Sequence, residues 1–383
     1  MAVNFNTIKS IFSAILQGDK MIWLCITLLA LLSVLTVYSS AEALANLEGM
    51  QAESFLIKHV VLLMGALILM YICHLTNYTQ YARLSTILIV MAIPLLVCTL
   101  LFGETINDAT RWIRIPLIDL TFQTSDFAKI ALITYAARTI SLMQSRAINI
   151  AELLIPVILI CGLIAPADLS SAIILFFTCI LLMFIGRVPI RDVLTLFVLG
   201  IGVFTILIAL ADYFPIIRVE TWVNRLQEFI TRTDAVNGEE QVQVVQAKMA
   251  IAKGGIFGVG PGNGEQAHFL PHGYSDYIFC IIIEEYGFFG ALVVLVLYLS
   301  LLIRCTRWVT RSPKTFGVLL AIGLCLSIVV QAFAHMAVNV GLLPVTGLTL
   351  PFVSMGGTSL IFTGISLGIM LSVSRYAEAE TKN

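Results

Sequence analysis

Residues 316–342 read FGVLLAIGLCLSIVVQAFAHMAVNVGL and contain no Asp, Glu, Lys or Arg. A helix needs roughly 20 mostly apolar residues to cross the hydrocarbon core of a bilayer, so this run predicts a transmembrane helix. The same criterion, applied outward from this run, finds nine more. The sequence therefore predicts an all-α polytopic membrane protein of about ten transmembrane helices, at 21–40, 56–75, 82–102, 126–144, 149–165, 169–186, 190–212, 276–303, 316–342 and 354–374. The pair at 149–186 leaves an alternative open, a single re-entrant hairpin.

The composition agrees with a lipid environment. Of the 383 residues 59% are hydrophobic and 12% are charged, and the mean hydropathy is +0.98. Soluble domains carry roughly 25% charged residues, so this much apolar surface needs lipid as its solvent. The net charge of −1 gives no indication of a nucleic-acid partner. All eight cysteines lie in or beside apolar runs without metal-ligand spacing, and we expect them to be small buried hydrophobic side chains.

The distribution of Lys and Arg predicts the orientation. Short cytoplasmic loops of membrane proteins are enriched in both residues, and the enrichment here favours cytoplasmic termini. Residues 1–20 then form an N-terminal cytoplasmic or interfacial segment, and residues 213–275 form one large extracytoplasmic loop. Because neither a soluble-domain composition nor an internal repeat is evident, we expect a single transmembrane domain over residues 1–383.

A first group of polar residues stands around the fourth predicted span. Asp126 and Lys129 are three residues apart at a helix start, so a structural ion pair is one interpretation. The other is a binding site, because an ionisable residue one turn inside a span is by default a functional candidate. Arg111 could join Lys129 in holding an anion such as a diphosphate.

A second group lies in the large loop. Gln243 and Gln246 lead into a glycine-rich segment, residues 254–264. No strand, loop and helix unit surrounds this segment, so a dinucleotide-binding site is not indicated. The glycines are expected to permit tight turns or the close approach of a bulky ligand.

A third group stands where the large loop becomes a helix. Either Ser275 or Asp276 could be the N-cap, and a Ser275 cap would leave Asp276 for chemistry. Glu284 follows about 12 Å further along the helix axis, and the paired carboxyl groups of glycosidases are at most roughly 9.5 Å apart. Asp276 is therefore expected to act alone, and Glu284 and Glu285 are expected to be structural.

A fourth group begins with Gln331 and His335, which lie on one helix face. His335 is interpreted as a buried core histidine, with catalysis as the less favoured alternative. The following residues, 341–359, read GLLPVTGLTLPFVSMGGTS and contain enough Pro and Gly to break a helix. Such backbone is tolerated at membrane depth only where it is buried in protein or lines a cavity.

These motifs resemble the SEDS proteins (shape, elongation, division and sporulation) over residues 20–375, most closely the FtsW branch and next the RodA branch. Residues 341–359 and the run LPHGYSDYIF, residues 270–279, carry most of the resemblance, and the family's catalytic aspartate falls on Asp276. Arg111-Trp112 matches the family's Arg-Trp pair, and QTSDFAK (residues 123–129) is similar to its Gln-Pro-Ser-Glu-x-x-Lys element. His272 and His335 replace the family's usual Glu and Asn, so no role is carried over to them.

The resemblance implies a peptidoglycan glycosyltransferase of cell division. Such enzymes polymerise lipid II, the undecaprenyl-diphosphate-linked disaccharide, into glycan strands and release undecaprenyl diphosphate. Asp276 would be the general base that deprotonates the acceptor hydroxyl, while cationic side chains such as Arg225 stabilise the diphosphate. The expected substrate-binding residues are Arg111, Asp126, Lys129, Arg218, Gln243, Gln246 and Ser354.

The resemblance also bears on partners, location and alternatives. It implies a penicillin-binding protein transpeptidase and divisome proteins as partners, and the bacterial cytoplasmic (inner) membrane with an extracytoplasmic active face. No cofactor is certain, and a divalent cation, Mg²⁺ or Mn²⁺, is left open. The alternatives are a transporter that flips lipid II, a RodA-type elongation polymerase, and a non-catalytic scaffold for division proteins.

Overall fold

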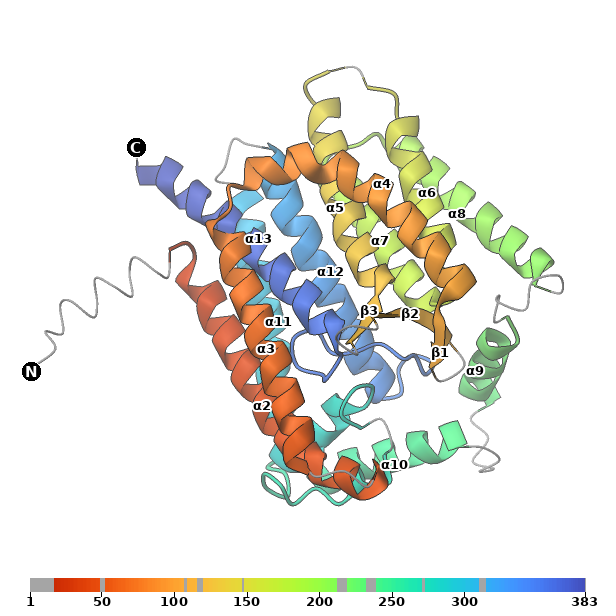
Figure 1. Ribbon diagram of the computed structural model, residues 1–383, viewed down its shortest axis with the longest axis vertical. Coiled ribbons are helices and arrows are strands. Elements are labelled where there is room, and N and C mark those ends of the chain that lie inside the picture. The colour runs from red at the N-terminus through yellow and green to blue at the C-terminus, as the bar shows by residue number, and fades with distance from the viewer. Residues whose placement is uncertain are drawn as a thin grey trace, which may run out of the picture.

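The computed structural model describes residues 17–48, 52–106, 109–115, 120–146, 148–211, 219–231, 239–270, 273–309 and 315–382 (Figure 1). The interfacial segment predicted at the N-terminus falls almost wholly outside these residues. The described helices are α2 (Lys20–Glu48), α3 (Ala52–Leu75), α4 (Tyr78–Phe102), α5 (Thr124–Met143), α6 (Ala151–Ile164), α7 (Leu169–Ile185), α8 (Ile190–Leu210), α9 (Val219–Thr231), α10 (Glu239–Gly254), the 3₁₀ helix η1 (Gln266–Phe269), α11 (Ile278–Val309), α12 (Thr315–Asn339) and α13 (Thr358–Lys382).

Helices α2 to α8 and α11 to α13 coincide with the ten predicted spans. Seven of them are long and apolar enough to cross a membrane. Every 18-residue window of α5 contains Asp126, Lys129 and Arg138, which explains why α5 is not among the seven. The prediction of an all-α polytopic membrane protein is confirmed.

The region 149–186 forms two helices with a tight turn at residues 165–168. Helices α6 and α7 have 14 and 17 residues. At 1.5 Å per residue they are about 21 and 26 Å long, shorter than the roughly 30 Å hydrocarbon core. The turn between them is therefore expected to lie below the level reached by the longer spans.

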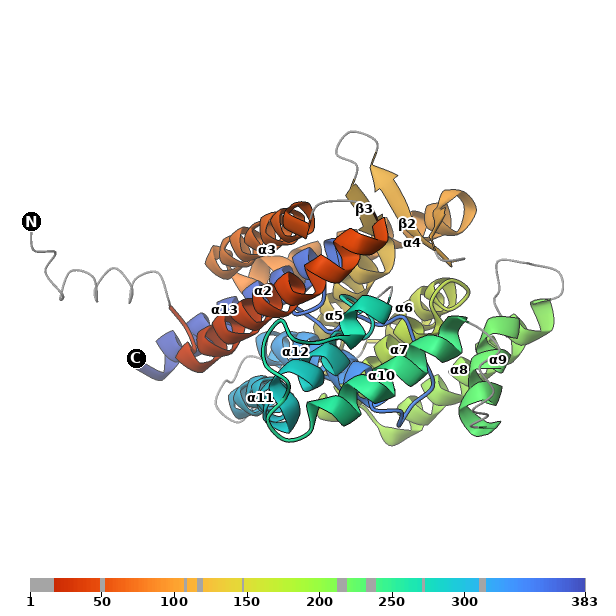
Figure 2. The ribbon, with the colours of Figure 1, turned by 90° about the horizontal axis from the view of Figure 1, so that it is seen from below.

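Helix α12 is the centre of the bundle (Figures 1 and 2). It packs against α5, α7, α11 and α13, and 78% of its apolar window is buried inside the protein. The corresponding fraction for α8, at the periphery, is 11%. Residues on α12 can therefore reach several chain segments at once, whereas α8 turns most of its surface outward.

A three-stranded antiparallel sheet covers one end of the bundle, and the sequence did not predict it. Its order is β1 (Glu104–Ile106), β2 (Ala109–Ile115), β3 (Leu120–Gln123). The hydroxyl of Thr358, at the start of α13, accepts a hydrogen bond from the Gln123 N–H at 3.1 Å and donates to the Thr121 carbonyl at 3.2 Å. This fixes the edge of the sheet to the bundle.

The glycine-rich segment 254–264 fills a break in α11. The helix is interrupted at Gly287, where φ is 66°. Two N–H groups of the segment donate to the carbonyls of Glu284 and Glu285, at 2.9 and 3.0 Å. A Cβ at Gly258 would stand 2.1 Å from the Glu285 carbonyl oxygen, so only glycine allows this approach. The predicted tight turns are confirmed, and the close approach is to the backbone of α11.

The side chains of Glu284 and Glu285 hold the same segment. Glu284 accepts hydrogen bonds from the N–H groups of Glu265 and Gln266 at 3.1 and 3.2 Å. Glu285 accepts from the N–H of Gly262 at 3.2 Å. Both glutamates are almost fully buried. The prediction that they are structural is confirmed.

Both ends of the bundle sequence lie together. The Asp19 N–H donates to the Ser374 hydroxyl at 3.1 Å, and its carboxylate lies 3.5 Å from Arg304 Nε. The start of α2 is thereby joined to the ends of α11 and α13. The two ends of the helical bundle therefore lie side by side, and the cytoplasmic placement of both termini stays a prediction.

Helices α3 and α13 approach closely through two glycines four residues apart. A Cβ would stand 2.6 Å from the Ala66 carbonyl oxygen at Gly364 and 2.2 Å from the Met70 carbonyl oxygen at Gly368. Small residues at this spacing allow the backbones of membrane helices to come into contact.

The substitution Gly368→Ala should therefore destabilise the protein, since overpacking costs about 1–3 kcal/mol. The expected result is a fall of several degrees in the unfolding midpoint of the detergent-solubilised protein. Gly65→Ala on α3 is the matched control, because no atom lies within 4 Å of its added Cβ. Equal midpoints for the two variants would show that the contact does not limit stability.

Candidate functional site

Four polar segments meet at the end of the bundle opposite the chain termini. They are strands β2 and β3, the turn 165–168, residues 273–277 and residues 340–357. Hydrogen bonds join them, from Arg111 Nε to the Ala167 carbonyl at 2.9 Å and from Ser354 Oγ to the Ser275 carbonyl at 2.8 Å. The polar residues predicted to share one face of the protein are thus brought together.

Asp276 lies in a turn two residues before α11 and is half-buried. Its Oδ1 accepts a hydrogen bond from the Ser275 hydroxyl at 2.9 Å. The Cys280 N–H at the start of α11 lies 3.3 Å from Asn339 Oδ1, and Asn339 Nδ2 donates to the Asp276 carbonyl at 2.9 Å. Asn339, from a different helix, therefore fills the capping role that the sequence suggested for Asp276 or Ser275.

One face of α12 carries three polar side chains at successive turns, Gln331, His335 and Asn339. Gln331 Nε2 donates to the Thr349 carbonyl at 3.0 Å. His335 Nδ1 lies 2.7 Å from the Leu348 carbonyl. Because a carbonyl only accepts, this nitrogen carries the proton and Nε2 is left as an acceptor. The prediction that His335 is a satisfied core histidine is confirmed.

The segment 340–357 is held from several directions. Ser354 Oγ donates to the Ser275 carbonyl and accepts from the Leu350 N–H, each at 2.8 Å. Phe352 has a φ of 64° and is buried, a conformation that a bulky residue adopts only when its surroundings impose it. Ser354 is itself buried, so its position supports holding the Asp276 segment rather than touching a ligand.

Arg111 and Asp276 face a common gap beside Gly347. A Cβ at residue 347 would lie 3.6 Å from both Arg111 Nη1 and Asp276 Oδ2, so these atoms are no farther apart than twice that distance. Arg111 is also held at the turn between α6 and α7, with Nη1 3.5 Å from the Asp168 carboxylate. A cation and a carboxylate thus both lie beside a residue that has no side chain of its own.

Asp168 is a residue of the site that the sequence reasoning did not single out. Its carboxylate caps α7 through the N–H and hydroxyl of Ser171, at 3.1 and 2.8 Å. Burial raises its pKa, but the charges of Arg111 and Lys129 and the Ser171 hydrogen bonds outweigh burial and hold the pKa below its usual value. The signal was available, because an Asp two residues before Ser at a predicted span start is typical of a capping residue.

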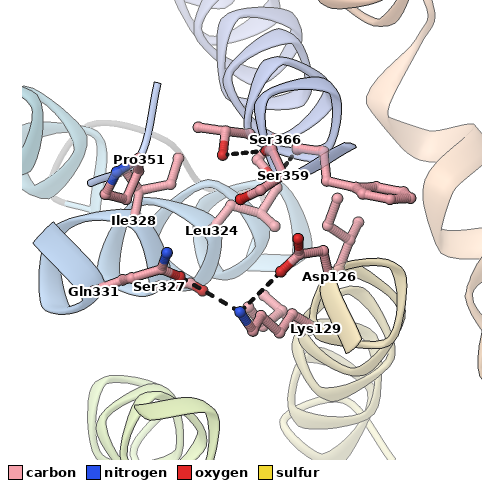
Figure 3. A pocket seen from close by; sticks show the side chains of 13 residues that line it. Asp126, Lys129, Leu324, Ser327, Ile328, Gln331, Pro351, Ser359 and Ser366 are labelled. Atoms are coloured by element: carbon pink, nitrogen blue, oxygen red, sulfur yellow. Dashed lines mark hydrogen bonds and ion pairs between the residues drawn. The ribbon is translucent and has the colours of Figure 1, made fainter. Parts of the chain in front are cut away.

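Asp126 and Lys129 line a second polar pocket between α5, α12 and α13 (Figure 3). Lys129 Nζ lies 3.0 Å from Asp126 Oδ1 and 3.5 Å from Gln331 Oε1. The predicted ion pair is confirmed. Asp126 Oδ2 is buried and has no hydrogen-bond partner among the described residues, so one carboxylate oxygen remains available toward the pocket.

The other predicted site residues stand farther from these contacts. Gln243 and Gln246 are half-buried on α10. This helix packs through Ala247 and Ala250 onto a small apolar cluster that includes Tyr277, the residue after Asp276. Arg218 lies outside the described residues, as does His272. Arg225 lies on α9 and is half-buried.

The described residues contain no group of three or more His, Cys, Asp or Glu side chains that could hold a metal ion. The gap offers the single carboxylate of Asp276. Mg²⁺ is commonly bound through one or two carboxylates together with substrate phosphates. A divalent cation here would therefore need a phosphate-bearing ligand to complete its coordination.

Comparison with known proteins identifies the family of this chain. The model for FtsW, RodA and SpoVE, described as cell cycle proteins, matches residues 19–379. The chain belongs to this family. As a family member it is a multi-pass membrane protein, in agreement with its apolar helices.

Several curated relatives match over almost their whole length. The probable peptidoglycan glycosyltransferase FtsW of Alkalilimnicola ehrlichii is 33% identical over 374 residues, which cover 94% of this chain and 90% of the relative. That of Trichlorobacter lovleyi is 30% identical, with 94% and 93% covered. Stage V sporulation protein E of Bacillus subtilis is 30% identical, with 94% and 97% covered.

Solved structures show the same fold. A chain from a structure on the coordination of polymerization and crosslinking by a peptidoglycan synthase complex is 24% identical, with a TM-score of 0.69 and coverage of 94% of this chain and 98% of that one. The rod shape determining protein RodA of Thermus thermophilus is also 24% identical, with a TM-score of 0.65 and coverage of 94% and 97%. At this identity the likeness establishes the fold alone.

The role of Asn339 can be tested by Asn339→Leu, which preserves volume and removes the amide. The Asp276 carbonyl would lose the Asn339 amide as a partner, and the Cys280 N–H would keep only its bond to the Tyr277 carbonyl at 3.0 Å. A buried group left unsatisfied costs about 1–3 kcal/mol. The expected result is a clear fall in the thermal unfolding midpoint. Val340→Ala, at the exposed next position, is the control and should change the midpoint little. An unchanged midpoint in the leucine variant would contradict the bridging role.

Proposed function

We propose that this chain is a peptidoglycan glycosyltransferase that polymerises lipid II into glycan strands during cell division. The observation that carries the proposal is the shared gap at Gly347, with Arg111 on one side and Asp276 on the other. Family membership and the names of the FtsW relatives support the substrate class and the division role.

The chemistry requires one base and a stabilised leaving group. Asp276 takes the proton from the 4-hydroxyl of the acceptor sugar as that oxygen attacks the anomeric carbon of the donor. The bond between the anomeric carbon and the phosphate oxygen breaks, and undecaprenyl diphosphate leaves with the electron pair. A diphosphate is a good leaving group, so one carboxylate suffices and the lack of a carboxylate pair is expected.

Arg111 is the cation best placed to stabilise the departing diphosphate. Its guanidinium is oriented by Ala167 and Asp168, so little reorganisation is needed when negative charge develops. Lys129 and Asp126, in the deeper pocket, extend the polar surface available to the substrate. Gln243 and Gln246, on the helix α10 that packs beside Asp276, are proposed to contact the sugar and peptide part of the substrate. Arg218, in the same loop of the sequence, is proposed to join them. Ser354 is proposed to act indirectly, by holding Ser275 beside Asp276.

The proposal includes a location and partners. The site faces the extracytoplasmic side of the bacterial inner membrane, because the opposite end carries the Lys- and Arg-rich short loops. A penicillin-binding protein transpeptidase and divisome proteins are the proposed partners. A structural neighbour that belongs to a peptidoglycan synthase complex, which coordinates polymerization and crosslinking, supports the first of these.

A lipid II transporter is the second candidate function. Broken helix α11 and the intramembrane Lys129 are features that transporters also show. The described ionisable residues of the site cluster at one end of the bundle, however, and a transport path needs polar groups across the whole membrane. The single-end arrangement favours the polymerase.

The substitution Asp276→Asn should remove polymerisation of purified lipid II, with a loss of roughly 10²–10⁴-fold expected for a general base. Product length and amount are read from a gel. Expression, membrane insertion and the unfolding midpoint should match the wild type. Glu152→Gln, an isosteric change at an exposed glutamate at the opposite end, is the control and should retain activity. Full activity in the asparagine variant would sink the proposal.

The gap itself can be tested by Gly347→Ala. The added methyl meets Arg111 and Asp276 at ordinary contact distance, so the protein should fold normally. Because the methyl occupies the space where the reacting atoms would lie, polymerisation should fall about tenfold or more, equivalent to about 1.4 kcal/mol. Gly202→Ala on α8, with no atom within 4 Å, is the matched control. Unchanged turnover in the Gly347→Ala variant would show that the reacting atoms do not lie beside residue 347.

A further inference from the structure

Helix α9, in the large loop, has one apolar and one polar face. At 100° per residue, its apolar side chains fall within an arc of about 120°. These are Val219, Trp222, Val223, Leu226, Phe229 and Ile230. Glu220, Asn224, Gln227 and Glu228 occupy the other side. A helix with this division buries its apolar stripe against something.

The described residues cover only part of that stripe. Val219, Trp222 and Phe229 are half-buried, whereas the exposed fractions of Val223 and Leu226 are both 52%, and that of Ile230 is 69%. On the polar side Glu220, Asn224, Gln227 and Glu228 are exposed as well, so α9 stands at the surface with half of its apolar side uncovered among the described residues. Whatever covers the exposed apolar side chains of α9 must therefore come from outside the described residues.

One contact places α9 at the depth of the membrane. The rings of Trp222 and Phe204 stack with centroids 6.1 Å apart and planes 20° from parallel. Phe204 is six residues before the end of α8, about 9 Å below it along the helix axis. Figures 1 and 2 both show α9 beside the end of α8. The chain therefore folds back toward the bilayer after α8 instead of continuing into water.

The neighbouring surface of α8 faces lipid. Phe204, Ile206 and Ile208 are exposed there, and only 11% of the span is buried inside the protein. The uncovered stripe of α9 starts at the stacked Trp222 and continues this lipid-facing surface. Trp is the side chain typical of the boundary between hydrocarbon and headgroups.

We propose that α9 is an interfacial helix, with its apolar stripe inserted among the lipids of the leaflet on the site side of the membrane. An amphipathic helix of this kind lies in the membrane plane, with its apolar face buried about 5–10 Å into the headgroup and acyl boundary. Its insertion fixes the first part of the large loop to the bilayer. Helix α10, which carries Gln243 and Gln246, follows directly in the chain and packs beside Asp276.

This anchoring does not rest on the polymerase chemistry. The anchoring keeps the loop beside the lipid surface. A ligand with a lipid tail and a polar head would therefore meet α9 at the depth where the ligand's polar head lies. The anchoring can therefore hold even when Asp276 proves not to be the base.

The experiment uses the full chain in lipid nanodiscs with an environment-sensitive fluorophore at one introduced cysteine. Cys98, the exposed native thiol, is replaced by Ala in every variant to limit background labelling. Leu226→Cys places the probe on the stripe, and Glu228→Cys places it on the polar face two residues away. Lipids with a spin label high on the acyl chain should quench the probe at residue 226 roughly threefold more than the probe at residue 228. The fluorescence emission of the probe at 226 should be blue-shifted, and that of the probe at 228 should not.

Two results would overturn the proposal. Equal, weak quenching at both positions would mean that α9 lies in water. A blue-shifted probe at 226 that spin-labelled lipid fails to quench would mean that a protein surface, such as a partner or a second copy, covers the stripe. A Trp222→Ala variant that lowers quenching at 226 would further support the contact with α8 as the anchor.

Discussion

The irregular backbone at the site end of this bundle depends on side chains that satisfy its N–H and C=O groups at membrane depth. No water is available in the hydrocarbon region, and an unsatisfied backbone group there costs several kcal/mol. The break in α11 is closed by the segment 254–264, whose N–H groups meet the freed carbonyls of Glu284 and Glu285. The segment 340–357 is closed by Gln331 and His335 on α12.

This constraint also positions the backbone at Asp276. A helix start exposes N–H groups that need acceptors, and the nearest carboxylate is normally the acceptor. Asn339 supplies that acceptor from α12 and simultaneously binds the Asp276 carbonyl. The aspartate is thus positioned through its backbone, while its carboxylate faces Arg111 across the gap at Gly347. The same face of α12 carries Asn339, which binds the Asp276 carbonyl, and Gln331, whose Oε1 lies 3.5 Å from Lys129 Nζ.

The long apolar runs and the local pairs could be predicted from the sequence because both depend on residues close in the chain. Asp126 and Lys129 are neighbours on any helix, so their ion pair followed from spacing alone. Asn339 and Asp168 could not be assigned roles in this way, since their partners, Cys280 and Arg111, are more than 50 residues away. The same is true of the glycines at 254–264, whose contact with α11 arises only in the folded bundle.

The sheet was missed for a different reason. Strands β1 and β2 are separated by only residues 107–108, Asn-Asp, a spacing that is typical of a hairpin. A search for apolar runs of roughly 20 residues does not detect strands of 3, 7 and 4 residues. Within β2 alternate residues share a face, so Arg111 and Ile113 lie on the same side of the strand. On β2, Arg111 is half-buried while Arg114, three residues later on the opposite face, is exposed. The hydrogen bonds between strands maintain this alternation, and a loop without such bonds would not.

The depth of the site follows from the short helices α6 and α7. Because each is shorter than the hydrocarbon core, their connecting turn, with Asp168, is expected to lie nearer the membrane interior than the ends of the longer spans. Arg111 reaches down from the sheet to this turn and is held there by an ion pair and a hydrogen bond. A buried cation needs such a partner, since an isolated charge in this environment would be unstable. The Arg111 guanidinium is therefore expected to lie below the membrane surface. A phosphate group attached to a lipid chain can reach that depth, whereas a soluble sugar nucleotide would have to leave the water to do so.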